Sequence, residues 1–267
     1  MLLWGVDFSG ARFPARAVWI AEACIVSKGL QIKALRSLAY WEGVTPRSPL
    51  AQCLMIFKQR LLAIRPACVG LDFPFSLPNR LLDAPNYSAL LQSFPKKFPT
   101  VIEFERFCRK WRPQPWRLTD IREHAPMSPC NLRLFRQTYW GITEILIPLW
   151  AKRGIRILPF QHFRTGDVHL IEVCPASLLK RNGQYKPYQG NTARHRQQRY
   201  QLVRWLKEAY SVQMTHQQIA VIVEQAEGDA LDALLGVLVP YQLLKRYGEI
   251  PLPAHPIAAI EGWIYSA

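Results

Sequence analysis

Two apolar segments far apart in the chain end in nearly the same residues, Gly-Val-Asp-Phe at 5–8 and Gly-Leu-Asp-Phe at 70–73. Each segment is short, apolar and followed by turn-forming residues, so each predicts a buried strand that ends at an aspartate. If the two strands are parallel neighbours, Asp7 and Asp72 emerge at one edge of a sheet. The alternative is that each aspartate only begins a turn. Two aspartates at equivalent strand ends favour a functional site.

Hydrophobic periodicity in the rest of the chain predicts an α/β protein. In the first 73 residues we expect strands over 2–6, 15–26, 30–38 and 68–73, and a helix over 49–64 that ends at Pro66. Beyond them we expect strands over 155–158 and 168–173, and helices over 132–150, 193–210 and 229–247, the last with a point of interruption at Pro240. A crossover through the first helix permits a parallel arrangement of the first and fourth strands.

The domain organisation follows from length and from the position of the prolines. A length of 267 residues suits one large α/β domain, and we expect a single domain over 1–267. Many of the 21 prolines lie between about 76 and 130, which limits regular structure there and predicts an insertion with short helices. We expect a basic helical segment at about 180–210.

The charge balance indicates a polyanionic partner. The chain has 34 Lys and Arg against 19 Asp and Glu, a net charge of +15, which would attract nucleic acid and equally anionic lipid. The six cysteines form no C-x-x-C pair, so the usual zinc and redox spacings are excluded. No apolar run approaches the roughly 18 residues of a membrane span, and no signal-peptide core is present. We therefore expect a cytoplasmic protein that does not enter the membrane.

A third group of acids occurs at the start of the last long helix. At 3.6 residues per turn, Asp229, Asp232 and Gly236 share one stripe of this helix, together with the small residue Ala233. A solvated stripe would carry Lys and Glu instead, so the composition favours a packed or functional face. The alternative is that Asp229 caps the helix and Asp232 faces solvent.

Glu172 lies within the apolar strand expected over 168–173. An unpaired charge there would be costly, so this carboxylate requires a cation. A salt bridge to one of the many arginines and ligation of a metal ion would both satisfy the requirement. The sequence leaves these two alternatives open.

These features together resemble the ribonuclease H-like superfamily, in which a mixed five-stranded sheet is flanked by helices. The resemblance rests on an aspartate that ends the first strand, an acid that ends the fourth and an aspartate on a late helix. The segments 5–7, 71–74, 171–175 and 228–233, and the Arg-x-x-Asp segment 117–120, are more specifically similar to an uncharacterised branch of predicted nucleases, domain of unknown function family 429.

The resemblance implies metal-dependent hydrolysis of the phosphodiester bonds of a nucleic acid. Asp7, Asp72 and Asp229 would be the catalytic carboxylates, and Asp232 and Glu172 would be further metal ligands or partners of the ligands. Hard carboxylate oxygens suit Mg²⁺ or Mn²⁺. Two such ions about 3.5 to 4 Å apart would activate the attacking water and stabilise the leaving oxygen.

Two basic clusters are candidate contacts for nucleic acid. The cluster at 96–117 is interleaved with aromatic residues that could stack on bases, and the cluster at 180–207 has eight basic residues and no acid. The residues expected to make contact are Lys110, Trp111, Arg112, Trp116, Arg117, Lys180, Lys186, Arg194, Arg196 and Arg199. The alternative for the second cluster is that Leu202, Trp205 and Leu206 pack into the core and the arginines form a solvated helix face.

Two other classes of function compete with the nuclease hypothesis. The turn at 5–10 could handle phosphate in an actin-like or sugar-kinase-type ATPase, which shares the sheet order. Such proteins need a second related domain, for which this chain is too short, and we find no second glycine-rich phosphate loop. The other alternative is a catalytically silent module that binds nucleic acid on the same scaffold.

Overall fold

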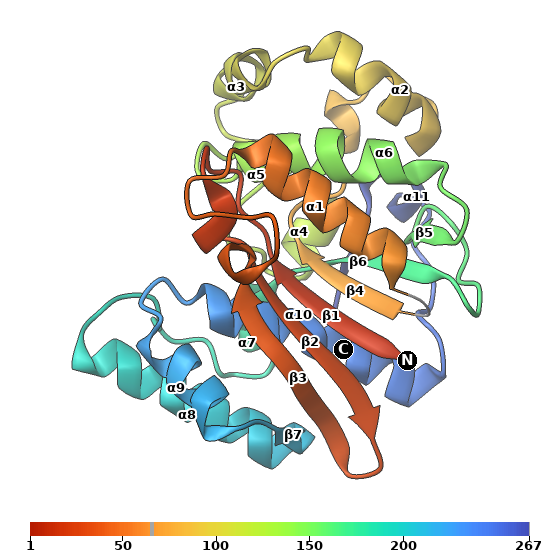
Figure 1. Ribbon diagram of the computed structural model, residues 1–267. Helices are drawn as coiled ribbons and strands as arrows, with labels where there is room; N and C mark the ends of the chain where they lie inside the picture. The colour runs from red at the N-terminus through yellow and green to blue at the C-terminus, as the bar shows by residue number, and fades with distance from the viewer. Residues whose placement is uncertain (65–66, 267) are drawn as a thin grey trace.

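The strands of the chain form one mixed sheet, seen in the computed structural model, which describes residues 1–64 and 67–266 (Figure 1). The strands are β1 (Leu2–Asp7), β2 (Trp19–Val26), β3 (Gly29–Ser37), β4 (Ala67–Asp72), β5 (Ile155–Ile157), β6 (Val168–Val173), β7 (Val212–Gln213) and β8 (Ile264–Tyr265). Their order is β5-β6-β4-β1-β2-β3-β7, with β8 beside β6. Strand β1 pairs antiparallel with β2 and parallel with β4, which is parallel to β6. The expected α/β class is thus confirmed.

The helices cover both faces of this sheet. They are α1 (Leu50–Ala63), α2 (Tyr87–Lys97), α3 (Val101–Arg109), α4 (Leu118–Arg122), α5 (Phe135–Trp140), α6 (Ile147–Trp150), α7 (Pro175–Arg181), α8 (Ala193–Tyr210), α9 (His216–Glu224), α10 (Asp229–Tyr247) and α11 (Ala258–Glu261). Figure 1 shows α1, α5 and α6 on one face of the sheet and α10 on the other. In the described part of the chain, none of these helices combines the length and apolar composition needed to cross a lipid bilayer.

Alternation along β1 assigns its residues to two separate cores. Trp4 and Val6 pack with α1 and α6 in one core, whereas Leu3 packs with α10 in the other. The same holds on β4, where Val69 belongs to the first core and Cys68 to the second. Successive strand residues point to opposite faces, so the position of an aspartate in this alternation decides which helix it faces.

The proline-rich segment 76–130 contains α2, α3 and α4, as short helices were expected there. Phe94 and Phe104, from α2 and α3, pack against Tyr139 of α5, with ring centroids 6.1 and 5.9 Å from that of Tyr139. These rings belong to the same hydrophobic core as Val6 of β1. The segment 76–130 is therefore packed onto the helical layer that covers the sheet.

Several expected boundaries differ from the structure. The strand expected over 15–26 begins only at Trp19, because Pro14–Arg16 form a 3₁₀ turn whose first residue fixes its own backbone angle. The helix expected over 132–150 starts at Phe135 and includes a π-helical turn at Gly141–Leu146, shortly before Pro148, which has no N–H to donate.

Other differences concern the last helix and the number of strands. Helix α10 continues through Pro240, since burial on nearly all sides outweighs the local propensity of proline. The sheet has eight strands among the described residues, against the five implied by the resemblance and the six expected from local patterns. The two that local patterns missed, β7 and β8, have two residues each and leave no alternating pattern. Pro66, expected to end the first helix, lies outside the described residues.

Candidate active site

The first two candidate carboxylates are direct partners in the sheet. In the parallel β1–β4 ladder Gly5 pairs with Gly70 and Asp7 pairs with Asp72. Neighbouring strands lie about 4.8 Å apart, so the two aspartates leave the sheet side by side. The expectation that these strands are parallel neighbours is confirmed by this register.

Glycine residues bring α10 directly onto these strands. A Cβ atom added to Gly5 would lie 2.1 Å from the carbonyl oxygen of Ala233, and one added to Gly70 would lie 2.4 Å from that of Gly236. Real Cβ atoms essentially never approach so closely, so only glycine at both strand positions permits this contact. Because Gly5 and Asp7 are two residues apart, both face α10.

The acids of α10 lie one turn before this contact. Asp229 and Asp232 precede Ala233 and Gly236 by four residues each, which is about one helical turn of 5.4 Å. They share the contact face of the helix and therefore lie beyond the glycines, beside the ends of β1 and β4. Gly228, immediately before the helix, has a φ of +89°, a left-handed conformation that favours glycine.

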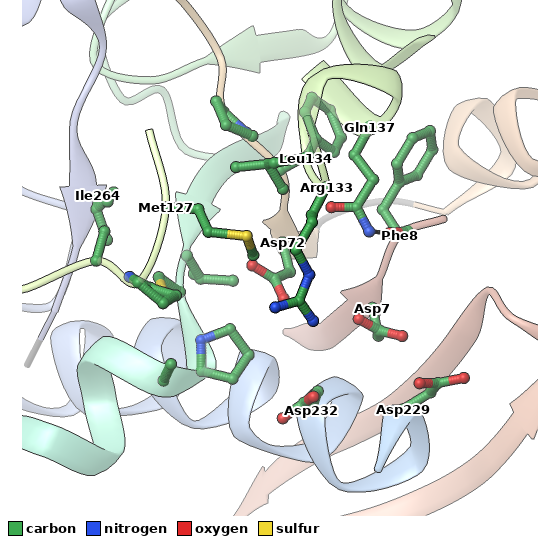
Figure 2. A pocket seen from close by; sticks show the side chains of 18 of the residues that line it. Asp7, Phe8, Asp72, Met127, Arg133, Leu134, Gln137, Asp229, Asp232 and Ile264 are labelled. Carbon is green, nitrogen blue, oxygen red and sulfur yellow. Dashed lines mark hydrogen bonds between the residues drawn. The ribbon is translucent and has the colours of Figure 1, made fainter. Parts of the chain in front are cut away.

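The four aspartates line one pocket of about 540 Å³ (Figure 2). Figure 2 shows their carboxylates around a common space, with α10 on one side of it and Arg133, Leu134 and Met127 on the other. Further wall residues come from the segment after α7 and from the end of β6. Asp232 is 7% exposed, whereas Asp7, Asp72 and Asp229 are half-buried.

Burial and mutual repulsion shift the pKa values of these carboxyl groups upward. The pKa of Asp7 lies well above its ordinary value, mainly because of burial and then because of the charges of Asp232, Asp229 and Asp72. The pKa of Asp72 is raised by burial and by Asp232 and Glu172. Burial is also the main cause that raises the pKa of Asp229 to about 6 and that of Asp232 to about 7. The cluster is a concentration of negative charge that is unfavourable without a cation.

Hydrogen bonds fix one carboxylate of the four. The Tyr188 hydroxyl donates to Asp232 Oδ1 at 2.5 Å, and Gln189 Nε2 lies 3.5 Å from Oδ2. No side-chain hydrogen bond to Asp7 or Asp72 is seen within the described residues. Tyr188 and Gln189 were not expected from the sequence, since they lie in an irregular segment with no motif.

In the conformations that the side chains adopt, the four carboxylates do not meet at a single point. Over residues 1–64 and 67–266, no group of three or more His, Cys, Asp or Glu side chains is close enough together to hold a metal ion. The register of β1 and β4 and the position of α10 bring the four backbones together, and the side chains surround a space between them.

Glu172 forms a buried ion pair, which is one of the two alternatives left open by the sequence. Arg117 donates to it from Nη1 at 2.8 Å and holds Asp120 through Nη2 at 2.7 Å. Arg117 and Asp120 are each 1% exposed and Glu172 is 2% exposed. The backbone N–H of Phe75 donates to the same carboxylate at 2.9 Å. Arg117 Nη2 also donates to Oε1 of Glu172, so both oxygens accept hydrogen bonds and Glu172 is not free to act as the metal ligand expected from the sequence.

Two of the expected nucleic-acid contacts, Arg117 and Arg199, are wrong because both side chains are buried, and a third, Trp111, is only partly accessible. Arg117 is buried in the ion pair described above. Arg199 is fully buried and donates to the carbonyl oxygens of Val223, Tyr188 and Gly190. Trp111 is half-buried and packs against the hydrophobic core, with its ring 6.1 Å from that of Phe107. Arg117 and Arg199 therefore support the fold through their buried hydrogen bonds, and Trp111 contributes to the packing of the core.

The remaining expected contacts are at least partly accessible. Lys180 and Arg196 are half-buried and donate to the backbone carbonyls of His124 and Asn191. The exposed ones are Lys110, Arg112, Trp116, Lys186 and Arg194. Of these five, Lys186 lines the carboxylate pocket.

Arg133 is a pocket residue that the sequence did not indicate. It is exposed, lines the pocket and points its guanidinium toward the carboxylates in Figure 2. It makes no ion pair with any residue that the structure describes. Gln137, in the first turn of α5, donates from Nε2 to the carbonyl oxygen of Phe8 at 2.6 Å. This hydrogen bond ties the start of α5, and with it the segment that carries Arg133, to the loop after Asp7.

Comparison of the chain with protein-family models, with curated proteins and with solved structures finds no match. The assignment of function therefore depends on the geometry of the carboxylate pocket and on the chemistry of its walls.

Proposed function

We propose that the chain is a divalent-cation-dependent nuclease of the ribonuclease H-like superfamily, which hydrolyses phosphodiester bonds of a nucleic acid. The observation that carries this proposal is the placement of Asp7 and Asp72 as register partners, with Asp229 and Asp232 lining the same pocket. Four carboxylates from three elements are gathered where the fold gains no stability from them. Such a costly arrangement is typical of a functional site.

The sheet topology supports the superfamily assignment. An antiparallel β1-β2-β3 meander is followed by a helix and by β4, parallel to β1, and β6 extends the sheet beyond β4. The acids lie at the ends of β1 and β4 and in the first turn of α10. This is the order of elements and acids from which the sequence resemblance was drawn.

The donor set of the pocket fits Mg²⁺ or Mn²⁺. Asp7, Asp72, Asp229 and Asp232 offer hard oxygen atoms only, the ligands that these cations prefer. After burial, the charges of neighbouring carboxylates contribute to the raised pKa values of Asp7 and Asp72, and a cation would relieve this repulsion. Asp7 and Asp72 have no hydrogen bond to lose within the described residues when their side chains turn toward an ion.

The residues of the pocket divide into three roles. The four aspartates would hold the cation, which supplies positive charge to a phosphate oxygen and activates water when bound. Tyr188 holds Asp232 in a fixed orientation. Arg133 and Lys186, on the other walls, would bind the phosphate groups of the substrate through charge-assisted hydrogen bonds. The net charge of +15 favours encounter with nucleic acid.

The test is incubation of the protein with labelled single-stranded and double-stranded DNA and RNA in Mg²⁺ and in Mn²⁺. We expect cleavage by the wild-type protein and its loss in Asp7→Asn, which removes a charge and keeps the shape. Asp83→Asn is the matched control, since Asp83 is exposed and pairs with Lys97 away from the pocket. Cleavage that survives in Asp7→Asn would refute the proposal. Binding without cleavage would favour the silent module, and ATP turnover would favour the kinase-type alternative.

A further inference from the structure

The four carboxylates line a pocket whose walls come from several elements, which restricts what can reach them. The volume of about 540 Å³ is within the range of about 300 to 1,000 Å³ that encloses a small organic ligand. Specific duplex-binding surfaces instead bury about 1,000 Å² or more of protein surface. Asp232 is 7% exposed and Asp7, Asp72 and Asp229 are half-buried, so none of the four carboxylates stands on a fully open surface.

Besides Arg117, which is held in its buried ion pair, two exposed cationic side chains line the pocket on walls away from α10. Arg133 precedes α5 and points its guanidinium toward the carboxylates, and Lys186 lies in the segment after α7. Both are exposed and neither forms an ion pair with a residue in the described ranges. Guanidinium binds phosphate through two parallel hydrogen bonds, so Arg133 is suited to a phosphate inside the pocket.

An aromatic face lies beside these cations. Tyr185 lines the pocket and is 46% exposed, so its ring is available to a ligand. Lys180 Nζ lies 5.3 Å from the ring centroid. Aromatic side chains stack on bases that have left the duplex, because a paired base has both of its faces covered by its neighbours.

We propose that the pocket receives one unpaired nucleotide of a single-stranded nucleic acid, with Arg133 binding its phosphate and Tyr185 stacking on a base. This inference rests on the proposed function, since it assumes that the pocket receives a phosphodiester. It goes further in naming the substrate class: single strands or unpaired ends are bound, and a blunt duplex is not admitted.

The test is equilibrium binding of a fluorescent oligonucleotide, measured by anisotropy with the Asp7→Asn protein in Mg²⁺ at about 0.15 M salt, where long-range attraction is screened. The probes are the single strand, the same strand in a blunt duplex, and the duplex with a single-stranded overhang. We expect the single strand and the overhang to bind at least about tenfold more tightly than the blunt duplex. Equal affinity for the blunt duplex would overturn the inference.

Variants of the pocket residues test which side chains cause the preference for single strands over the blunt duplex. Arg133→Gln and Tyr185→Ser are each expected to weaken single-strand binding about tenfold and to leave the residual duplex binding unchanged. Lys28→Gln, which removes an exposed charge in the β2–β3 turn at the far end of the strands, is the control and should have little effect. An equal loss for both probes in Arg133→Gln would contradict the inference. Because binding is measured without hydrolysis, a single-strand preference with no cleavage by wild type would refute only the nuclease proposal.

Discussion

Asp7 and Asp72 are register partners in the parallel β1–β4 ladder, and each follows by two residues a glycine that contacts the backbone of α10. The two glycines and the two aspartates therefore face the same helix. This pairing explains why one motif occurs at the end of both strands: the glycine admits the helix, and the aspartate meets the acids of the helix one turn earlier.

The stability of the metal-free protein should fall as the pH rises from about 5 to 8. The pKa of Asp232 is raised from 3.8 to about 7 and that of Asp229 to about 6, so the folded protein binds more protons than the unfolded chain in this range. Excess protons on the folded state make the free energy of unfolding decrease with pH. Urea denaturation in a chelating buffer at several pH values measures this slope.

Asp7→Asn should reduce this slope and raise the free energy of unfolding at pH 8 by at least about 1 kcal/mol, since one pKa unit corresponds to about 1.4 kcal/mol. Asp83→Asn is the control. Because Lys97 lowers the pKa of exposed Asp83, this carboxyl group is already ionised above pH 5 and adds nothing to the pH dependence of stability between pH 5 and 8. A wild-type stability that is constant or increases over this range, with no gain in Asp7→Asn, would show that the carboxylates do not repel one another.

Alanine should destabilise the protein more at Gly5, in strand β1, than at Gly236, in helix α10. Gly5→Ala places a methyl group 2.1 Å from the carbonyl oxygen of Ala233, and the forced shift of α10 should cost about 1–3 kcal/mol or more. Gly236→Ala meets its nearest atom at 3.3 Å and gains helix propensity, so it should cost less. Chemical denaturation of both variants measures the difference. A larger loss for Gly236→Ala would contradict the close approach described for β1.

Glu172→Gln should destabilise the protein without removing the cation site. Arg117 would keep Asp120 and lose its second carboxylate, and breaking such a buried pair typically costs about 3–5 kcal/mol. Because Glu172 is occupied by Arg117, binding of Mn²⁺ to the folded variant should be unchanged. Thermal unfolding and calorimetric titration with Mn²⁺ give the two readouts. Normal stability combined with lost Mn²⁺ binding would restore Glu172 as a ligand.

The sequence predicted the elements that carry strong local patterns. The strand ends at Asp7 and Asp72 and the helix that begins at Asp229 follow from apolar runs and turn residues. Their parallel pairing is permitted by the crossover rule. The role of Gly5 and Gly70 could have been inferred as well, since a glycine two residues before each acid must share its face.

The sequence predicted less well which basic residues are buried and which line the pocket, although a helical stripe in the sequence indicated the burial of one of them. Arg199 lies in the i, i+3, i+4, i+7 stripe with Leu202, Val203 and Leu206, so its position on the buried face of α8 could be inferred. Arg133 could not be distinguished from other exposed arginines, because its position depends on how the segment before α5 packs against the loop after β1. Tertiary contacts of this kind leave no local pattern.

The most direct test of a cation site in the carboxylate pocket is calorimetric titration of Mn²⁺ into the wild-type protein and into Asp7→Asn, Asp72→Asn and the control Asp83→Asn. We expect saturable binding to wild type and to Asp83→Asn, and affinity at least about tenfold weaker in the two pocket variants, each of which loses a ligand oxygen with its charge. Identical binding by all four proteins, or none by wild type, would contradict a cation site formed by Asp7 and Asp72.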